Sequence, residues 1–174
     1  MKTDRLKPCD ILLYKGKGFT SWLIQAGTGS KYDHVAVVAN PQMNLAIESN
    51  TGRQSGVRAI DLRKLQAHSI DIYRVRPQFS FKPEQVISYL VSRLGAPYDW
   101  GGVIALGAMK ALSFVTGFKK FTGFHQFQKN KDYFCSELVY EAFEKGGLDI
   151  VPQVSEADVT SPGDIAASDR VEKI

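Results

Sequence analysis

The first 76 residues contain a series of short runs rich in apolar and β-branched residues, most of them closed by Gly, Asn or Pro. Runs of this length bounded by turn-forming residues are typical of strands joined by short connections. They predict strands over 11–14, 34–39, 45–49, 57–62 and 70–76. The last of these runs alternates cleanly between apolar and polar residues. We therefore expect an antiparallel sheet or barrel arranged as a meander.

The pattern changes to a helical period after Pro77. Residues 83–94 carry apolar residues at helical spacing, with Pro83 near the start and Gly95 just past the end. A second helix is predicted to begin near Cys135, because an apolar stripe follows and Gly146-Gly147 can stop the helix. A short helix or turn is also expected over 19–26. A sheet followed by helices indicates an α+β fold.

The size and composition indicate one folded globular domain over 1–174. Hydrophobic residues make up 44% of the chain and the net charge is only +4. No run of Lys or Arg is long enough to indicate a nucleic-acid partner. The two cysteines, Cys9 and Cys135, give no disulfide framework, and the polar N-terminus does not look like an export signal. We therefore expect reduced thiols and a cytoplasmic location.

Neither a metal nor another cofactor is expected. The two Cys and three His residues never occur at the short spacings of known zinc sites.

An apolar segment over 101–118 is interrupted only by Lys110 among charged residues. About 20 apolar residues can cross a bilayer. The internal lysine and the glycines Gly107 and Gly117 favour a buried or lid-like helix within an insertion around 101–132, or an apolar wall of a substrate groove. We expect contact with a membrane at most, and no spanning segment.

Cys135 is the candidate nucleophile, because it stands at the start of a predicted helix. The N–H groups of a first helical turn favour an anion. A thiol placed there or beside a His is more readily ionised than an ordinary one. The alternative is that Cys135 is a small buried hydrophobic residue of the core.

His34 is the candidate base and Glu48 the candidate residue that orients it. Pairing of 37–38 with 45–46 brings residues near 34 and 48 roughly opposite each other, so Glu48 can accept the far ring N–H of His34. A structural histidine and a solvent-facing glutamate are the alternatives, and His68 and His125 are other possible bases.

Six motifs in a fixed order resemble the circularly permuted branch of the NlpC/P60 superfamily, the YiiX/YebB/YycO-like papain-fold cysteine hydrolases. The motifs are Cys-Asp-Ile-Leu-Leu at 9–13, Asp-His-Val-Ala-Val-Val at 33–38, Ile-Glu-Ser at 47–49, Gly-Ala-Pro-Tyr-Asp-Trp at 95–100, Tyr-Phe-Cys-Ser-Glu-Leu-Val-Tyr at 133–140 and Ser-Pro-Gly-Asp-Ile at 161–165. The resemblance covers about residues 8–168. In this branch the histidine strand precedes the cysteine helix.

The resemblance implies a papain-like fold with its nucleophile at a helix N-terminus. It assigns Cys135 as nucleophile, His34 as base and Glu48 as orienting residue, and it places Tyr98 near the substrate cleft. Backbone N–H groups at Cys135 or Ser136 would stabilise the oxyanion. Cys9 departs from the family, which has Gly at this position, and the insertion around 101–132 is a second departure.

The implied activity is hydrolysis of an amide bond in a peptide or acyl-amide, such as a cell-wall peptide, through a thioester intermediate. Two alternatives are a lipid acyltransferase or lipid hydrolase like the LRAT-like permuted enzymes, and a non-catalytic binding module of the same fold. Slow alkylation of Cys9 and Cys135 at equal rates would favour the binding module.

Overall fold

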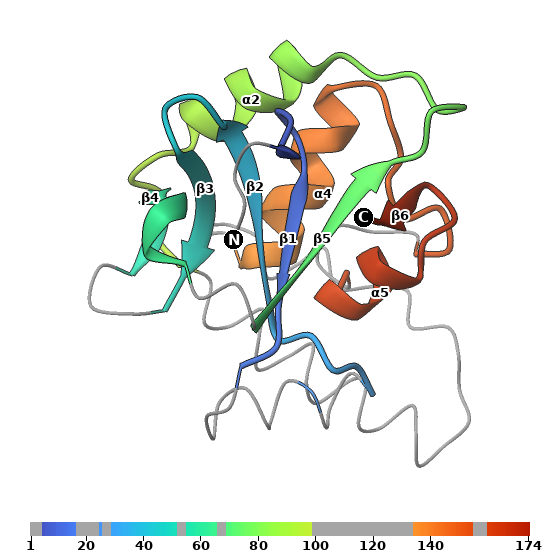
Figure 1. Ribbon diagram of the computed structural model, residues 1–174, viewed down its shortest axis with the longest axis horizontal. Coiled ribbons are helices and arrows are strands. Elements are labelled where there is room, and N and C mark those ends of the chain that lie inside the picture. Colours follow the sequence, from blue (N-terminus) through green and yellow to red (C-terminus); the bar gives the residue numbers. More distant parts are fainter. Residues whose placement is uncertain are drawn as a thin grey trace, which may run out of the picture.

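The computed structural model describes residues 5–16, 25, 29–51, 55–65, 69–98, 134–154 and 160–174. Within these residues the chain forms one antiparallel sheet with the strand order β4-β3-β2-β1-β5-β6 (Figure 1). Its strands are β1 (Ile11–Tyr14), β2 (His34–Asn40), β3 (Leu45–Asn50), β4 (Gly56–Asp61), β5 (Ile70–Val75) and β6 (Val171–Lys173). The five strands predicted from the sequence are therefore confirmed, with small shifts at their ends.

Strands β1 to β4 follow one another as a meander, but β5 does not continue it. β5 pairs with β1, with Leu12 opposite Ile72. It therefore lies toward the edge of the sheet formed by β6, while β4 forms the opposite edge. The prediction of a continuous meander is wrong at this strand. The backbone groups of β1 that β2 leaves unpaired find their partners on β5, a long-range choice that a local pattern does not reveal.

The two faces of the sheet bury different residues, because neighbouring side chains on a strand point to opposite sides. Val35 and Val37 of β2 belong to a core shared with the helices. Ala36 and Val38 belong to a second core on the opposite face, where they pack near Leu62 of the short 3-10 helix η2 (Leu62–Lys64).

Three helices complete the described fold: α2 (Pro83–Ser92), α4 (Cys135–Lys145) and α5 (Pro162–Ala167). The helix predicted over 83–94 is confirmed, with its last turn ending at Ser92. The helix predicted near Cys135 begins at that residue and buries the expected stripe of Leu138, Val139, Ala142 and Phe143. α4 packs against α2, β2 and β3, which places its N-terminus beside the sheet (Figure 1).

Cys9 stands where the resemblance to the permuted family would place glycine. Its φ of 68° lies in the left-handed region, which L-residues with a side chain seldom adopt. The side chain is 2% exposed, and the thiol donates a hydrogen bond to the carbonyl of Pro83. This backbone conformation explains why the resemblance expects Gly here.

Two predicted segments lie outside the described residues: the short helix or turn over 19–26, apart from Gln25, and the insertion around 101–132. Among the helices of the described ranges, none has the length and apolar character needed to cross a membrane.

Candidate active site

Cys135 is the first residue of α4, and Phe134 is the N-cap. The N–H groups of Cys135 and Ser136 have no acceptor within the helix, because the first four N–H groups of any helix lack one. Glu137 accepts a hydrogen bond from the Phe134 N–H at 3.4 Å, which helps to fix the start of the helix. Cys135 is 6% exposed, and neither it nor Cys9 forms a disulfide. The sulfur therefore lies at the positive end of the helix dipole.

His34 and Glu48 form a direct hydrogen bond between neighbouring strands. The His34 Nε2 and the Glu48 Oε2 are 2.7 Å apart, and the two side chains are 16% and 4% exposed. Glu48 lies opposite Ala36, two residues from His34 on the same face of the sheet, so the contact is diagonal. The predicted pairing was thus slightly displaced: Val37 lies opposite Ile47, and the register shifts between Val38 and Asn40.

Cys135 also reaches His34, although its helix packs on the other face of the sheet. The β2–β3 ladder ends at the Ala36–Glu48 pair. Beyond that pair, β2 continues to His34 along β1 and β3 continues to Asn50 along β4, so the two strands separate (Figure 1). α4 contacts both strands, and the Cys135 side chain hydrogen-bonds to His34 at this open end. Since Nε2 is bonded to Glu48, Nδ1 is the ring nitrogen left for the sulfur.

Both neighbours of the imidazole favour its protonated form. Burial lowers the pKa of His34, but the hydrogen bonds to Cys135 and Glu48 and their negative charges outweigh it and raise the pKa to about 10. Burial likewise opposes ionisation of Glu48, yet His34, Arg58 and Asn50 lower its pKa to about 2. The arrangement therefore stabilises the imidazolium form of His34 beside the Glu48 carboxylate.

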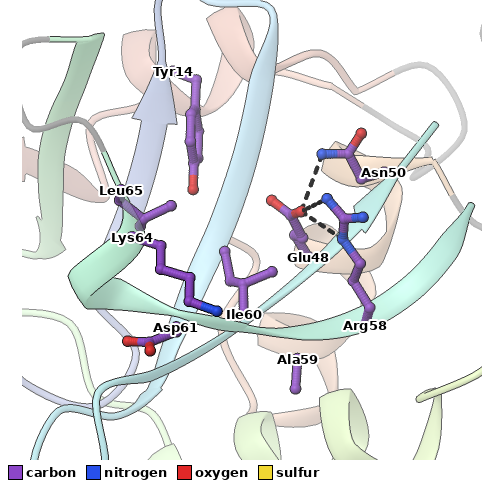
Figure 2. A pocket seen from close by; sticks show the side chains of 9 residues that line it. All are labelled: Tyr14, Glu48, Asn50, Arg58, Ala59, Ile60, Asp61, Lys64 and Leu65. Carbon is purple, nitrogen blue, oxygen red and sulfur yellow. Dashed lines mark hydrogen bonds and ion pairs between the residues drawn. The ribbon is translucent and has the colours of Figure 1, made fainter. Parts of the chain in front are cut away.

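Two residues that sequence reasoning missed hold the Glu48 carboxylate. The Arg58 Nε and Nη2 donate to the Glu48 Oε1 at 2.9 and 2.7 Å, and the Asn50 Nδ2 donates to the same oxygen at 3.0 Å (Figure 2). The other carboxylate oxygen of Glu48, Oε2, is the one that hydrogen-bonds to His34. Arg58 lies directly opposite Glu48 on β4. Alternation along a strand over 57–62 puts Arg58 and Ile60 on one face, so the β3–β4 register was the information that the sequence lacked.

Tyr14 is a third neighbour that the sequence did not single out. Its ring lies 5.0 Å from the His34 ring between centroids, tilted by 55°. Burial, followed by the charge of Glu48, raises the pKa of its hydroxyl. Tyr14 and Glu48 line a hollow of about 370 Å³ on the sheet face away from α4, together with residues of β4 and η2 (Figure 2). The Tyr14 ring thus packs against the His34 side of the His34–Glu48 pair.

The remaining predicted residues lie in different surroundings. The Ser136 hydroxyl is fully buried and donates to the Thr160 carbonyl at 2.7 Å, so this side chain ties α4 to the segment before α5. Its predicted role toward substrate therefore depends on its backbone N–H. Tyr98 is 8% exposed and follows a segment in which Ala96 accepts a hydrogen bond from Val57. His68 and His125 lie outside the described residues.

Comparison with known proteins finds similarity at the level of the fold. No family model matches the sequence, and no curated protein matches it. A crystal structure described as the metalloprotein yiiX from Escherichia coli O157:H7 superposes with a TM-score of 0.68 at 16% identity, over 97% of this chain and 96% of that chain. At this identity the likeness shows a shared fold. The predicted α+β fold, with an antiparallel sheet against helices in the YiiX-like papain type, is confirmed.

The description of yiiX as a metalloprotein raises the question of a metal here. Within the part of the chain that the structure describes, no three His, Cys, Asp or Glu side chains are grouped in a way that could hold a metal ion. The described residues therefore do not fit a bound metal ion.

Proposed function

We propose that the protein is a cysteine hydrolase of the permuted NlpC/P60 type that cleaves an amide bond in a peptide or acyl-amide substrate. The observation that carries the proposal is the position of the His34 imidazole, which hydrogen-bonds to the Cys135 sulfur and, through Nε2, to Glu48. Nucleophilic catalysis by cysteine needs this set: a thiolate, a neighbouring base and a third group that orients the base.

In the first step the Cys135 thiolate attacks the carbonyl carbon of the substrate. A C–S bond forms and the carbonyl electron pair moves to oxygen, where the N–H groups of Cys135 and Ser136 would receive the negative charge. One such donor is typically worth about 10²–10³ in rate. The His34 imidazolium gives its proton to the leaving nitrogen, the C–N bond breaks, and a thioester remains on Cys135.

In the second step neutral His34 takes a proton from water as the water oxygen attacks the thioester. The C–S bond breaks, the acid product leaves, and the thiolate–imidazolium pair is restored. Glu48 takes part by position and charge: it binds the Nε2–H and keeps Nδ1 directed at the sulfur. Arg58 and Asn50 hold Glu48 in turn.

Two further observations support the proposal. The order of the three residues along the chain, His34 then Glu48 then Cys135, is the order of the permuted family. The fold shared with yiiX over nearly the whole chain agrees with that family assignment. The substrate class, amide rather than ester or lipid, comes from the resemblance.

Labelling with a series of acyl electrophiles, followed by intact-mass and peptide-mass analysis, tests the proposal. We expect an acyl adduct on Cys135 in the wild type and in Cys9→Ala, and none in Cys135→Ala. In His34→Ala the adduct should form at least about 100 times more slowly. Water should release the adduct as free acid, whereas release only to an added acceptor would indicate an acyltransferase. Absence of any Cys135 adduct, or a rate unaffected by His34→Ala, would contradict the proposal.

A further inference from the structure

A second group of charged residues surrounds Asp71 of β5. The Lys15 Nζ and the Lys173 Nζ contact the same oxygen, Asp71 Oδ1, at 2.9 and 3.1 Å. The Lys31 Nζ lies 3.8 Å from Oδ2. We call Lys15, Lys31, Lys173 and Asp71 the lysine cluster. The three lysines come from three separate segments, after β1, before β2 and on β6, so only the fold brings them together.

The charges of the lysine cluster do not balance. Three ammonium groups share one carboxylate, so the cluster itself carries an excess of two positive charges among the described residues. The carboxylate nearest in sequence to Lys31 is that of Asp33, which instead accepts the Gly16 N–H at 2.6 Å. Because Lys15 and Lys173 contact one oxygen, their like charges are also held close together.

Asp71 itself is firmly placed. Its side chain is 8% exposed, and the Tyr32 hydroxyl donates to Oδ2 at 2.6 Å while also contacting the Tyr73 hydroxyl at 3.0 Å. Lys15, Lys31 and Lys173, by contrast, are 34%, 63% and 53% exposed. The cluster thus combines a buried carboxylate, held in place by Tyr32, with ammonium groups that solvent can reach.

We propose that the lysine cluster is a binding site for a phosphate monoester group. Such a group carries a charge of about −1.5 to −2 at neutral pH and has three strong acceptor oxygens. It therefore matches both the charge excess and the several ammonium donors of the cluster. A single carboxylate would compensate only part of the excess. The proposal concerns residues outside the Cys135 site and does not depend on the proposed hydrolase activity.

The lysine cluster lies near the candidate active site. Leu13 of β1 is opposite Val35 on one side and opposite Asp71 on the other. Asp71 is therefore two strands away from the residue next to His34, a separation of roughly 10 Å at the usual strand spacing. A phosphate bound here could belong to the same molecule as a group at Cys135.

Titration with inorganic phosphate at constant ionic strength, followed by amide NMR shifts, tests the proposal. We expect saturable shifts at residues 31, 71 and 173, and binding weakened about tenfold in Lys15→Gln and in Lys173→Gln. Lys145→Gln is the matched control, because Lys145 is an exposed lysine in the last turn of α4. Shifts that do not saturate, or that are the same in the cluster variants and the control, would overturn the proposal.

Asp71→Asn provides a test of opposite sign. Removing the carboxylate leaves three ammonium groups for the ligand, so phosphate should bind about tenfold more tightly and should raise the melting temperature more than in the wild type. If the lysines serve only to neutralise Asp71, phosphate will not stabilise this variant, and the proposal fails. The lysine variants retain a test if Asp71→Asn does not fold.

Two probes separate a soluble ester from a lipid headgroup. Glycerol 1-phosphate is titrated by NMR, and vesicles of phosphatidylcholine with or without phosphatidic acid are tested by co-sedimentation. Binding to glycerol 1-phosphate alone indicates a soluble ester. Binding to phosphatidic acid vesicles that is lost in Lys15→Gln indicates a lipid. Binding to neither overturns the proposal.

Discussion

Cys9 and Cys135 are buried to nearly the same extent, 2% and 6% exposed, but they differ in the charges around them. The Cys9 thiol donates to the Pro83 carbonyl at 3.6 Å. Burial, then the charges of Asp10 and Glu84, raise its pKa to about 12. Cys135 instead begins a helix and hydrogen-bonds to His34. Burial alone therefore does not distinguish an inert thiol from a candidate nucleophile, whereas the sign of the neighbouring charge does.

The largest effect on stability is expected at Glu48, the partner of His34, in comparison with Glu84, whose charge acts on Cys9. Glu48→Ala removes the partner of both His34 and Arg58, and should lower the free energy of unfolding by about 3–5 kcal/mol, as for a broken buried ion pair. Glu84→Ala, at an exposed position in the first turn of α2, should cost less than about 1 kcal/mol. Urea unfolding of both variants provides the measurement. Equal losses would contradict a stabilising role for the Glu48 ion pairs.

A second effect is the pH dependence of the His34–Glu48 pair. The pKa of His34 is raised to about 10, so its contribution to stability is fully present below its ordinary value near 6.5 and is lost as the pH rises toward 10. The pKa of Glu48 is lowered to about 2, so its contribution is present above about 4.5 and is lost as the pH falls toward 2. The stability difference between wild type and Glu48→Gln should thus be largest between about pH 4.5 and 6.5. A difference independent of pH from 3 to 10 would contradict this account.

The smallest effects concern the backbone at Cys9. Cys9→Gly removes the strain of a positive φ but also a buried side chain, so the free energy of unfolding should change by less than about 1 kcal/mol. Cys9→Val should destabilise by about 2 kcal/mol or more, because a β-branched residue tolerates this φ poorly. Thermal unfolding distinguishes the two variants. A valine as well tolerated as glycine would show that the turn rearranges freely.

Much of the fold was predictable because local sequence determines it. The strand at His34, the helix start at Cys135 and the helix end at Gly146-Gly147 each follow from a few neighbouring residues. The position of β5 in the sheet was not predictable, because β5 pairs with β1, a strand about sixty residues earlier in the chain. Local signals do not encode such a choice.

The candidate site likewise contains some residues that the sequence identifies and others that only the fold reveals. His34, Glu48 and Cys135 could be selected by residue type, spacing and family resemblance. Arg58 could not, because its contact with Glu48 requires the β3–β4 register. The meeting of Cys135 with His34 required knowledge that the β2–β3 ladder ends at Ala36 and Glu48. Alternation alone would have placed the sulfur and the imidazole on opposite faces of the sheet.

The most direct test of the central claim is the pH dependence of iodoacetamide alkylation at Cys135 and Cys9. Because the imidazolium persists to high pH beside the sulfur, the Cys135 rate should change little between pH 6 and 8, and at pH 6 it should exceed the Cys9 rate at least about 100-fold. In His34→Gln the Cys135 rate should rise roughly tenfold per pH unit, as for an ordinary thiol. Equal, slow rates at the two cysteines, with no change in His34→Gln, would contradict the account.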